Sequence, residues 1–397
     1  MRSQLIRLSS GFVALALVAS APSVLAGEAD ALPPSIANAM AQAAPQAIME
    51  YRRKLQEYQE ARAAFEQDAT AYWNAIADKR RGRNAKRRDR VQISLDDYVL
   101  QQPPVYEGPK RPVNPAPEEE EGGKRPPKTI PVVSDLLRAA AEQFQFTPQR
   151  PAKELEFKRA YARYARAAGL TPEQAVRVYS FETGGTGNYD VQAGIEHGGK
   201  RAISTAMGYN QLLTTNTVEL LAEQGHEFVR DLSERVAATQ GPARKAMEHK
   251  LAVLKKMVAF SRTVPDDWSA HQRLADTAQG WACHAMVLDI DVGPMLQTHK
   301  LLTSVIFARN KGYTRPLTAA ELEMMNLTGD GTGLDMVTMP QAMREQVPTS
   351  NFFQRSGYER NPVAIRHNTV ARLLAVTNER MDFNSNKPGA RELAAAF

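Results

Sequence analysis

One glutamate stands where a carboxyl group could act as a general acid. Glu182 follows Ala175, Val178 and Tyr179 at helical spacing, so the four side chains share one helix face, which is otherwise apolar or aromatic. A carboxyl group at the C-terminal end of such a face meets both desolvation and the negative end of the helix dipole. Both disfavour its charged form, as a proton donor working near neutral pH requires. Spacing alone also fits an exposed glutamate at a fraying helix end.

A second polar segment follows the glycine-rich loop after Glu182. It runs from Ser204 to Leu213 with the sequence STAMGYNQLL, and a helix is expected to begin near Thr215. Gly208 would let the backbone approach a ligand closely. The amide of Gln211 offers both donors and acceptors to a polar ligand.

Together, these two features resemble the soluble lytic transglycosylase group of the lysozyme-like superfamily. That group pairs a glutamate at a helix end with a downstream segment of the form Ala-x-Gly-x-x-Gln-aliphatic, matched here by Ala206, Gly208, Gln211 and Leu212. The resemblance covers about residues 155–225. The interval between the two features is longer than in the group, which implies an insertion at about 187–201. Position 202, where the group often has a serine, is alanine, so Ser204 is the candidate for that role.

The resemblance implies an enzyme that cleaves peptidoglycan glycan strands between N-acetylmuramic acid and N-acetylglucosamine. Glu182 would protonate the glycosidic oxygen while the substrate's own N-acetyl group stabilises the positive centre. The same glutamate would then deprotonate the muramic C6 hydroxyl, giving a 1,6-anhydro product. No metal and no organic cofactor would be needed. The sugar-binding residues expected from the match are Ser204, Met207, Gly208, Tyr209, Gln211 and Tyr358.

Lytic transglycosylases of this group have a C-terminal tyrosine close to the catalytic glutamate. Tyr358 is the first candidate for that tyrosine here, and Tyr313 is the second. Two other functions fit the same residues. A hydrolase of the same fold, such as a muramidase or a chitinase-like enzyme, would need a second carboxylate, for which Asp190 and Glu196 are available. A non-catalytic envelope protein would only bind glycan.

Other reactive side chains form no recognisable site. The seven histidines have no metal-ligand spacing and are expected mostly at the surface, and residues 330–335 are expected to form a turn rather than a calcium loop. Ser204 has no evident His/Asp partners for a nucleophilic triad. Cys283 is the only cysteine, which excludes an intramolecular disulfide, and we expect it to be a small buried side chain.

Helices must position these residues, because the chain from residue 132 onward carries helix signals and few strand signals. Capping boxes at 171–174 and 318–321 predict two helix starts, and Gly184-Gly185 predicts a helix end directly after Glu182. Other helices are expected at about 152–168, 216–224, 227–238, 242–261, 270–289, 293–311, 319–326 and 363–380. Loops are expected at 183–205, 263–269, 326–340 and 348–362. We predict an all-α lysozyme-like domain over residues 132–397, with at most a minor β element.

Two regions of different composition precede this domain. Residues 101–131 contain nine prolines and an acidic run, so they are expected to form an extended or disordered linker. Residues 27–100 form a helical, basic accessory segment, in which the stretch 44–79 carries a heptad-like apolar stripe. The stripe predicts packing within the same chain or against a partner protein of the envelope.

The N-terminus and the net charge of +6 point to the cell envelope. Residues 1–26 combine a basic start, a short apolar run and Val-Leu-Ala, which is typical of a secretory signal peptide, with a retained anchor as the alternative. We therefore expect a periplasmic or secreted protein. Eight of the twelve residues at 79–90 are Lys or Arg. In an exported protein this favours anionic envelope polymers or lipid headgroups over nucleic acid, unless the run is a solvated, disordered segment.

Overall fold

The computed structural model describes residues 34–115, 129–195 and 201–397, with side chains from residue 45 onward. This part of the chain is mostly helical and has no strand beyond isolated β-bridges, such as those that pair Met207 with Gln192 and with Leu212. The prediction of an all-α chain is confirmed. None of the described helices is long and apolar enough to cross a membrane. The predicted signal peptide lies outside the described residues.

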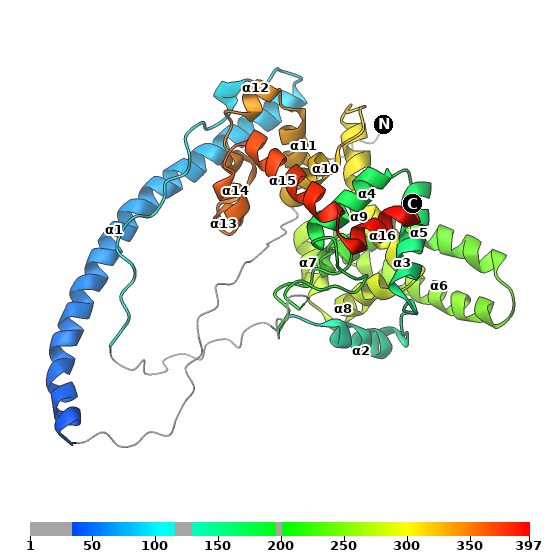
Figure 1. Cartoon of the computed structure of the whole chain (residues 1–397), viewed down its shortest axis with the longest axis horizontal. Coiled ribbons are helices and arrows are strands. Elements are labelled where there is room, and N and C mark those ends of the chain that lie inside the picture. Colours follow the sequence, from blue (N-terminus) through cyan, green and yellow to red (C-terminus); the bar gives the residue numbers. More distant parts are fainter. Residues whose placement is uncertain (1–33, 116–128, 196–200) are drawn as a thin grey trace.

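The chain begins with one long helix, α1 (Pro34–Arg88), followed by a short 3-10 turn, η1 (Leu95–Asp97). The helical body contains α2 (Val133–Phe144), α3 (Glu154–Ala167), α4 (Pro172–Glu182), α5 (Thr214–Ala238), α6 (Gly241–Ser261), α7 (Trp268–Ala275), α8 (Ala278–His284), η2 (Ala285–Leu288) and α9 (Gly293–Asn310). The C-terminal part contains α10 (Ala319–Thr328), α11 (Asp330–Thr338), α12 (Gln341–Arg344), η3 (Thr349–Phe352), α13 (Arg355–Glu359), α14 (Pro362–Arg366), α15 (Val370–Ser385) and α16 (Pro388–Ala396). Figure 1 shows α1 reaching out from this body.

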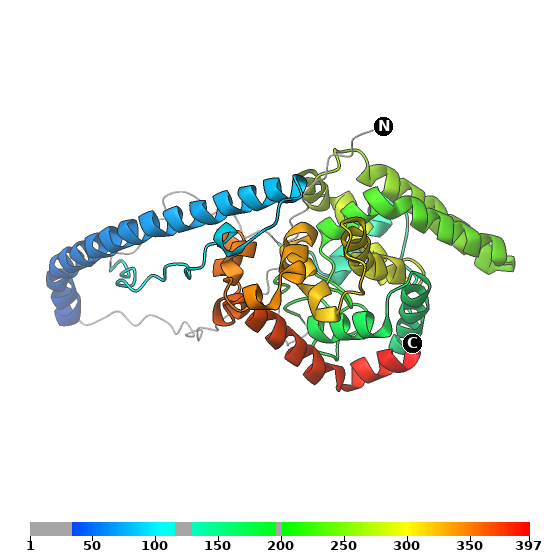
Figure 2. The same ribbon diagram turned by 90° about the horizontal axis from the view of Figure 1, so that it is seen from above.

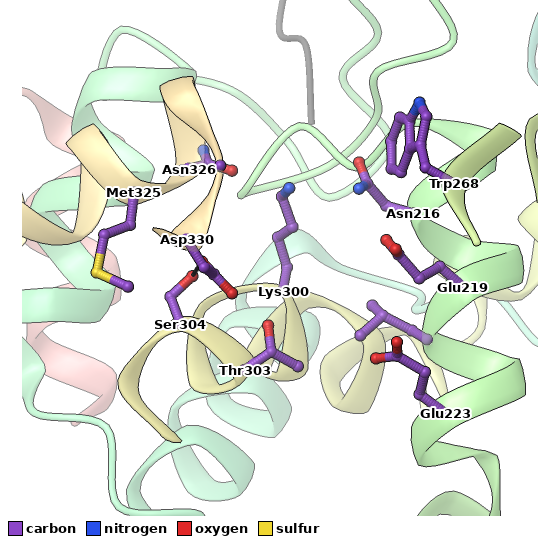
Figure 3. A pocket seen from close by; sticks show the side chains of 12 residues that line it. Asn216, Glu219, Glu223, Trp268, Lys300, Thr303, Ser304, Met325, Asn326 and Asp330 are labelled. Carbon is purple, nitrogen blue, oxygen red and sulfur yellow. Dashed lines mark hydrogen bonds between the residues drawn. The ribbon is translucent and has the colours of Figure 1, made fainter. Parts of the chain in front are cut away.

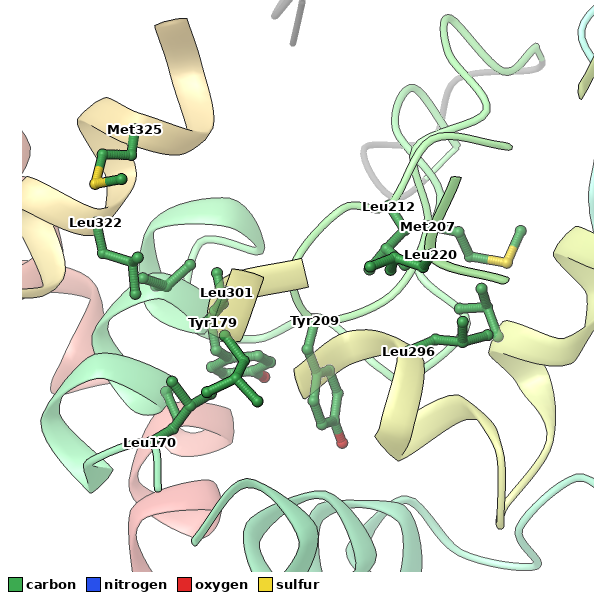
Figure 4. Close-up of a cluster of buried hydrophobic side chains, with 14 of the residues drawn as sticks. Leu170, Tyr179, Met207, Tyr209, Leu212, Leu220, Leu296, Leu301, Leu322 and Met325 are labelled. Atoms are coloured by element: carbon green, nitrogen blue, oxygen red, sulfur yellow. The ribbon is translucent and has the colours of Figure 1, made fainter. Parts of the chain in front are cut away.

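Helix α9 is the centre of the body. It packs against α3, α5, α10 and α11, and every residue from Gly293 to His299 is buried. A helix segment that is buried on all sides, as the N-terminal part of α9 is, belongs in the core rather than at the surface. Figure 4 shows Leu296 and Leu301 of this helix among apolar side chains from α4, α5 and α10. The helix that carries Glu182 and the helix that follows the STAMGYNQLL segment therefore share one core.

The predicted caps of α4 and α10 are confirmed. The Thr171 hydroxyl accepts a hydrogen bond from the Gln174 backbone N–H at 3.1 Å, and the Gln174 side chain accepts one from the Thr171 N–H at 3.0 Å. Thr318 and Glu321 form the same reciprocal pair at the start of α10. Helix α4 ends at Glu182 as predicted, and the glycines that follow adopt left-handed backbone angles.

Two predicted interruptions are wrong. Helix α5 continues through the expected break between 224 and 227, and α11 occupies the turn expected at 330–335, within the loop expected at 326–340. A Cβ atom added to Gly225 would lie 2.5 Å from Val258 of α6, and one on Gly333 would lie 2.3 Å from the Cα of Met325 on α10. Taken locally, these glycines suggest a break, but in the fold they allow close contact between helices.

Two further regions differ in detail from the expected elements. The helix expected at 270–289 is divided into α7, α8 and η2. The loop expected at 348–362 contains η3 and α13. Short helical turns of this kind have little periodic signal of their own, so tertiary contacts decide where they form.

The C-terminal half of α1 packs against the rest of the chain, as the apolar stripe predicts for one of its two outcomes. Ala69 and Ile76 are buried, with exposed fractions of 1% and 2%. The Tyr72 hydroxyl lies 2.7 Å from the Ser350 hydroxyl. Nearer its N-terminus, α1 is covered only in part, by the ring of Tyr106 against Tyr58 and Phe65. Binding of a partner protein to the stripe stays a prediction.

The predicted linker is described only for residues 101–115, which have no regular secondary structure. They run back along α1, as Figure 2 shows. The Gln102 side chain donates to the backbone oxygen of Asn368 at 3.3 Å. This part of the region is therefore extended, as expected, and in contact with other parts of the chain.

The basic run 79–90 is largely the end of α1, and its interpretation as a disordered segment is wrong. Arg83 has an exposed fraction of 1% and donates to the backbone oxygens of Asp97 at 2.9 Å and Asn351 at 3.3 Å. Arg80 donates to the backbone oxygens of Asn351 and Phe353. At least two of the basic side chains are thus used inside the protein. Binding of anionic polymers or headgroups by the others stays a prediction.

Candidate functional site

Glu182 lies half-buried at the C-terminal end of α4, against α10. The amide Nδ2 of Asn326 donates a hydrogen bond to Glu182 Oε1 at 2.9 Å. Glu323, one helical turn before Asn326, has an exposed fraction of only 3%. Burial, and after it the charge of Glu182, raises the pKa of Glu323 well above its usual range. The site therefore holds a partly accessible carboxyl group beside a buried one whose pKa is raised.

Neither of these α10 residues was predicted from the sequence as part of a site. Their signal is visible in hindsight, since Glu323 and Asn326 are polar, lie three positions apart and interrupt the apolar run formed by Leu322, Met324 and Met325. Polar groups on a buried helix need partners, so such a pair indicates a site more often than a plain core helix would. Only the fold shows that the partner is Glu182.

Asn326 also lines an open pocket, shown in Figure 3. The pocket lies between α5, the start of α7, α9 and the junction of α10 with α11, and holds about 580 Å³ of space, counting the open solvent at its mouth. Its polar walls include Asn216, Glu219, Glu223, Lys300, Asn326 and Asp330. Trp268 adds a partly exposed indole ring. An aromatic ring beside amide and charged groups suits a polar ligand with an apolar face, such as a sugar.

The pocket is acidic. Burial, followed by the charge of Glu223, raises the pKa of Glu219 to about 8. Burial and the nearby Asp266 raise the pKa of Glu223 to about 7. Burial also raises the pKa of Asp330, which accepts a hydrogen bond from the Ser304 hydroxyl at 2.5 Å. Lys300 is the only cation in the described lining, and Figure 3 shows it reaching up between the two acidic walls.

The STAMGYNQLL segment packs against the inner side of α4. Met207 and Tyr209 are fully buried, and the Tyr209 ring meets the Tyr179 ring with centroids 4.9 Å apart (Figure 4). The Tyr209 hydroxyl donates to Glu154 at 2.5 Å. In this structure neither side chain has a surface to offer to a sugar. They hold α4 and the segment together.

Gly208, Gln211 and Ser204 stabilise the conformation of the same segment. A Cβ atom on Gly208 would lie 2.1 Å from the Gln297 amide nitrogen on α9, and the residue has a left-handed φ of 79°. Gln211 has an exposed fraction of 5% and donates to the Gly208 backbone oxygen at 2.8 Å. The half-buried Ser204 accepts a hydrogen bond from the Ala206 N–H at 3.1 Å. Their types are therefore explained by the fold before any ligand is considered.

The segment leads directly into the pocket wall. Helix α5 begins at Thr214, one residue before the expected start, and the Asn216 side chain accepts a hydrogen bond from the Leu213 N–H at 3.1 Å. The first three turns of α5 then carry Glu219 and Glu223 into the pocket. His284 links the start of α5 to the preceding segment. Its ring nitrogens lie 2.8 Å from the Thr217 hydroxyl and 3.0 Å from the Thr205 backbone oxygen. Burial lowers the pKa of His284 to about 4.

The remaining candidates lie elsewhere. Tyr358 has an exposed fraction of 4%, and its ring packs against Trp73 of α1 and Phe353. Tyr313 contacts the Arg315 guanidinium. Asp190 forms an ion pair with Arg150. Glu196, the other carboxylate considered for a hydrolase, lies outside the described residues.

Three of the histidines expected at the surface are buried, namely His271, His284 and His299, so that expectation is wrong for them. Within the described ranges, no group of three or more His, Cys, Asp or Glu side chains could hold a metal ion. Cys283 is fully buried, as expected for a small core side chain.

Compared with known proteins, the chain matches no protein-family model, no curated protein and no solved structure.

Proposed function

We propose that the protein cleaves the glycan strands of peptidoglycan between N-acetylmuramic acid and N-acetylglucosamine, with Glu182 as the acid and then the base. The observation that carries the proposal is the position of Asn326. Its amide nitrogen holds Glu182, and the same side chain lines the open pocket. A carboxyl group predicted from the sequence to be catalytic is thus tied to the wall of a pocket that a sugar could enter.

Each step needs only groups of this chain and of the substrate. Glu182 gives its proton to the glycosidic oxygen, and the bond from that oxygen to the muramic C1 breaks. The muramic N-acetyl group stabilises the positive centre at C1. Glu182, now a carboxylate, takes the proton of the C6 hydroxyl, whose oxygen bonds to C1 and closes the 1,6-anhydro ring. Asn326 keeps the carboxylate oriented through its hydrogen bond.

The pocket suits one sugar of the strand. Asn216 and Asn326 offer amide groups, and Trp268 offers a ring face on which a sugar could stack. Met207, Gly208, Tyr209 and Gln211 act through the fold in this proposal, because they set the position of α4 and α5. A strand outside the cytoplasm as substrate agrees with the periplasmic or secreted location expected from the N-terminus.

The test is digestion of purified peptidoglycan by the full chain, with mass spectrometry of the released fragments. We expect fragments that end in 1,6-anhydro sugars and are lighter than hydrolysis products by one water. Glu182→Gln should remove the activity by at least about a thousandfold, since the proton donor is lost. Glu173→Gln, on the same helix but exposed at its other end, is the matched control and should remain active.

The outcomes separate the alternatives. Ordinary reducing ends that depend on Glu182 would indicate the hydrolase, and the transglycosylase proposal would then be wrong. If the wild-type protein releases no fragments, or if Glu182→Gln is as active as wild type, the enzymatic proposal fails. Binding of glycan without cleavage would then favour the non-catalytic envelope protein.

A further inference from the structure

The pocket beside Glu182 has more carboxyl groups than cations. Glu219 and Glu223 face it from α5, and Asp330 faces it from the start of α11. Asp266, in the loop before α7, adds its charge and a hydrogen bond to Glu223. Against these four carboxyl groups stands one cation, Lys300 of α9. Burial is the largest cause of the raised pKa values of Glu219, Glu223 and Asp330, and repulsion from neighbouring carboxyl groups adds to it for the two glutamates.

A second feature of the pocket is independent of these charges. The Oδ1 atom of Asn326 is buried and has no hydrogen-bond partner among the described residues. The residue has an exposed fraction of 7%. Its Nδ2 is directed to Glu182, and Figure 3 shows the carbonyl oxygen on the side that faces the pocket. A buried acceptor without a partner is rare, because it loses its bonds to water and gains none. A donor group of a ligand in the pocket would satisfy it.

These two features select the same chemistry. Carboxylates and an amide oxygen are all acceptors, so the complementary ligand group is positively charged and rich in N–H donors. An ammonium group fits, with three donors and one charge. Trp268 at the rim can add a cation–π contact or stack on the ring that carries the amine. An N-acetylated sugar would offer one N–H and no charge.

We propose that this pocket binds an ammonium group of the substrate. The amine belongs either to an amino sugar without its acetyl group or to a diamino acid of the peptide attached to the glycan. The proposal rests on the proposed function, since it names the part of the strand that enters beside Glu182. Sugars next to the cleaved bond keep their acetyl groups, and the ammonium group anchors the strand one position away.

The test is calorimetric binding to the full chain carrying Glu182→Gln, so that no ligand is cleaved. One arm compares a fully N-acetylated chitooligosaccharide with a partly deacetylated one of equal length. A second arm compares a glycan fragment whose peptide amine is free with the same fragment after acetylation of that amine. We expect the free amine to bind at least about tenfold more tightly in one arm, as the loss of one charge-assisted hydrogen bond implies. The arm that shows the difference identifies the source of the amine.

Two variants locate the effect. Glu219→Gln combined with Glu223→Gln should remove the preference for the amine, while binding of the acetylated ligand changes little. Glu234→Gln, an exposed glutamate further along α5, is the matched control. If the double variant does not fold, proton release by the parent protein serves instead. Titration in two buffers of different ionisation enthalpy should show protons released on binding, because an ammonium group favours the ionised form of Glu219.

Equal affinity for amine and acetylated ligands in both arms overturns the inference. A preference for the amine that survives the double variant also overturns it. Where the double variant does not fold, binding without proton release has the same consequence. These outcomes are separate from the failure of the proposed function. An active enzyme without amine preference refutes only the inference. A protein that prefers amines but cleaves no glycan refutes only the proposed reaction.

Discussion

Among the described residues charge is buried in several places, and two of these places differ in what surrounds it. Where α1 meets the C-terminal part, Arg83 is enclosed with backbone oxygens of Asp97 and Asn351 as acceptors, and its guanidinium lies 4.4 Å from the centroid of the Tyr98 ring. In the pocket, Glu219 and Glu223 stand beside further carboxyl groups with one lysine among them. The first cluster is enclosed, and backbone oxygens accept from both Nη atoms of Arg83, although its Nε has no partner among the described residues. The second is open to solvent and has one cation for several carboxyl groups.

The difference indicates which cluster holds the fold together and which awaits a ligand. A buried cation with hydrogen-bond acceptors around it is expensive to disrupt, because removal of one partner leaves the others unsatisfied. Carboxyl groups without counterions make the folded state less stable as they ionise. Proteins keep such arrangements mostly at functional sites. Four experiments test this contrast.

The largest effect on stability is expected at Arg83, where α1 packs against the C-terminal part of the chain. Arg83→Ala removes the donor to the Asp97 backbone oxygen and one of the two donors to the Asn351 oxygen, and it leaves a cavity beside Tyr98 and Phe352. We expect the free energy of unfolding to fall by about 3 kcal/mol in urea denaturation. Arg81→Ala, two positions earlier and with a side chain 74% exposed, should change it by less than about 0.5 kcal/mol. Equal effects of the two variants would mean that the buried contacts of Arg83 do not stabilise the fold.

A smaller effect is expected where Glu182 meets the pocket wall. Asn326→Leu keeps a similar volume but removes the hydrogen bond to Glu182. We expect kcat to fall about thirtyfold, since a hydrogen bond to a charged group contributes roughly 2 kcal/mol. The pH profile should also shift, because the carboxylate loses its donor. Asn310→Leu, at the exposed end of α9, is the control. An unchanged pH profile would reduce Asn326 to a packing role.

The pocket should also make stability depend on pH. The pKa of Glu219 rises from 4.5 to about 8 on folding, so the folded state binds its proton more tightly than the unfolded state. Stability from this group is therefore present below pH 4.5 and lost as pH rises through about 8. Glu219→Gln should flatten the fall in Tm between these limits, and Glu234→Gln should not. A Tm profile unaltered by Glu219→Gln would contradict the raised pKa.

The smallest effect is expected at the partly exposed ion pair between Arg355 and Glu66, whose atoms lie 2.6 Å apart. Glu66→Gln should lower the free energy of unfolding by less than about 1 kcal/mol, because solvent and salt screen such pairs. Urea denaturation at low and high salt measures it. A loss as large as that of Arg83→Ala would show that partial exposure is no guide to the strength of the α1 contacts.

Local signals predicted well wherever they act over a few residues. The caps of α4 and α10, the end of α4 at Glu182 and the start of α5 are all close to their expected positions, because a cap depends on side chains three residues apart. Predictions failed at two glycines whose role is to allow contact with a distant helix. Gly225 and Gly333 suit neighbouring helices, α6 and α10, which no local pattern reveals.

For the candidate site, the sequence by itself determined the helix face of Glu182 and the helical start that follows the STAMGYNQLL segment. It could not assign Asn326 and Glu323 to Glu182, since more than 140 positions separate them and only the packing of α10 on α4 joins them. The same holds for the basic run, whose charges suggested an external partner until α1 was seen to bury Arg83. Periodicity and capping are properties of neighbouring residues, whereas the partner of a buried charge is decided by which helices pack together.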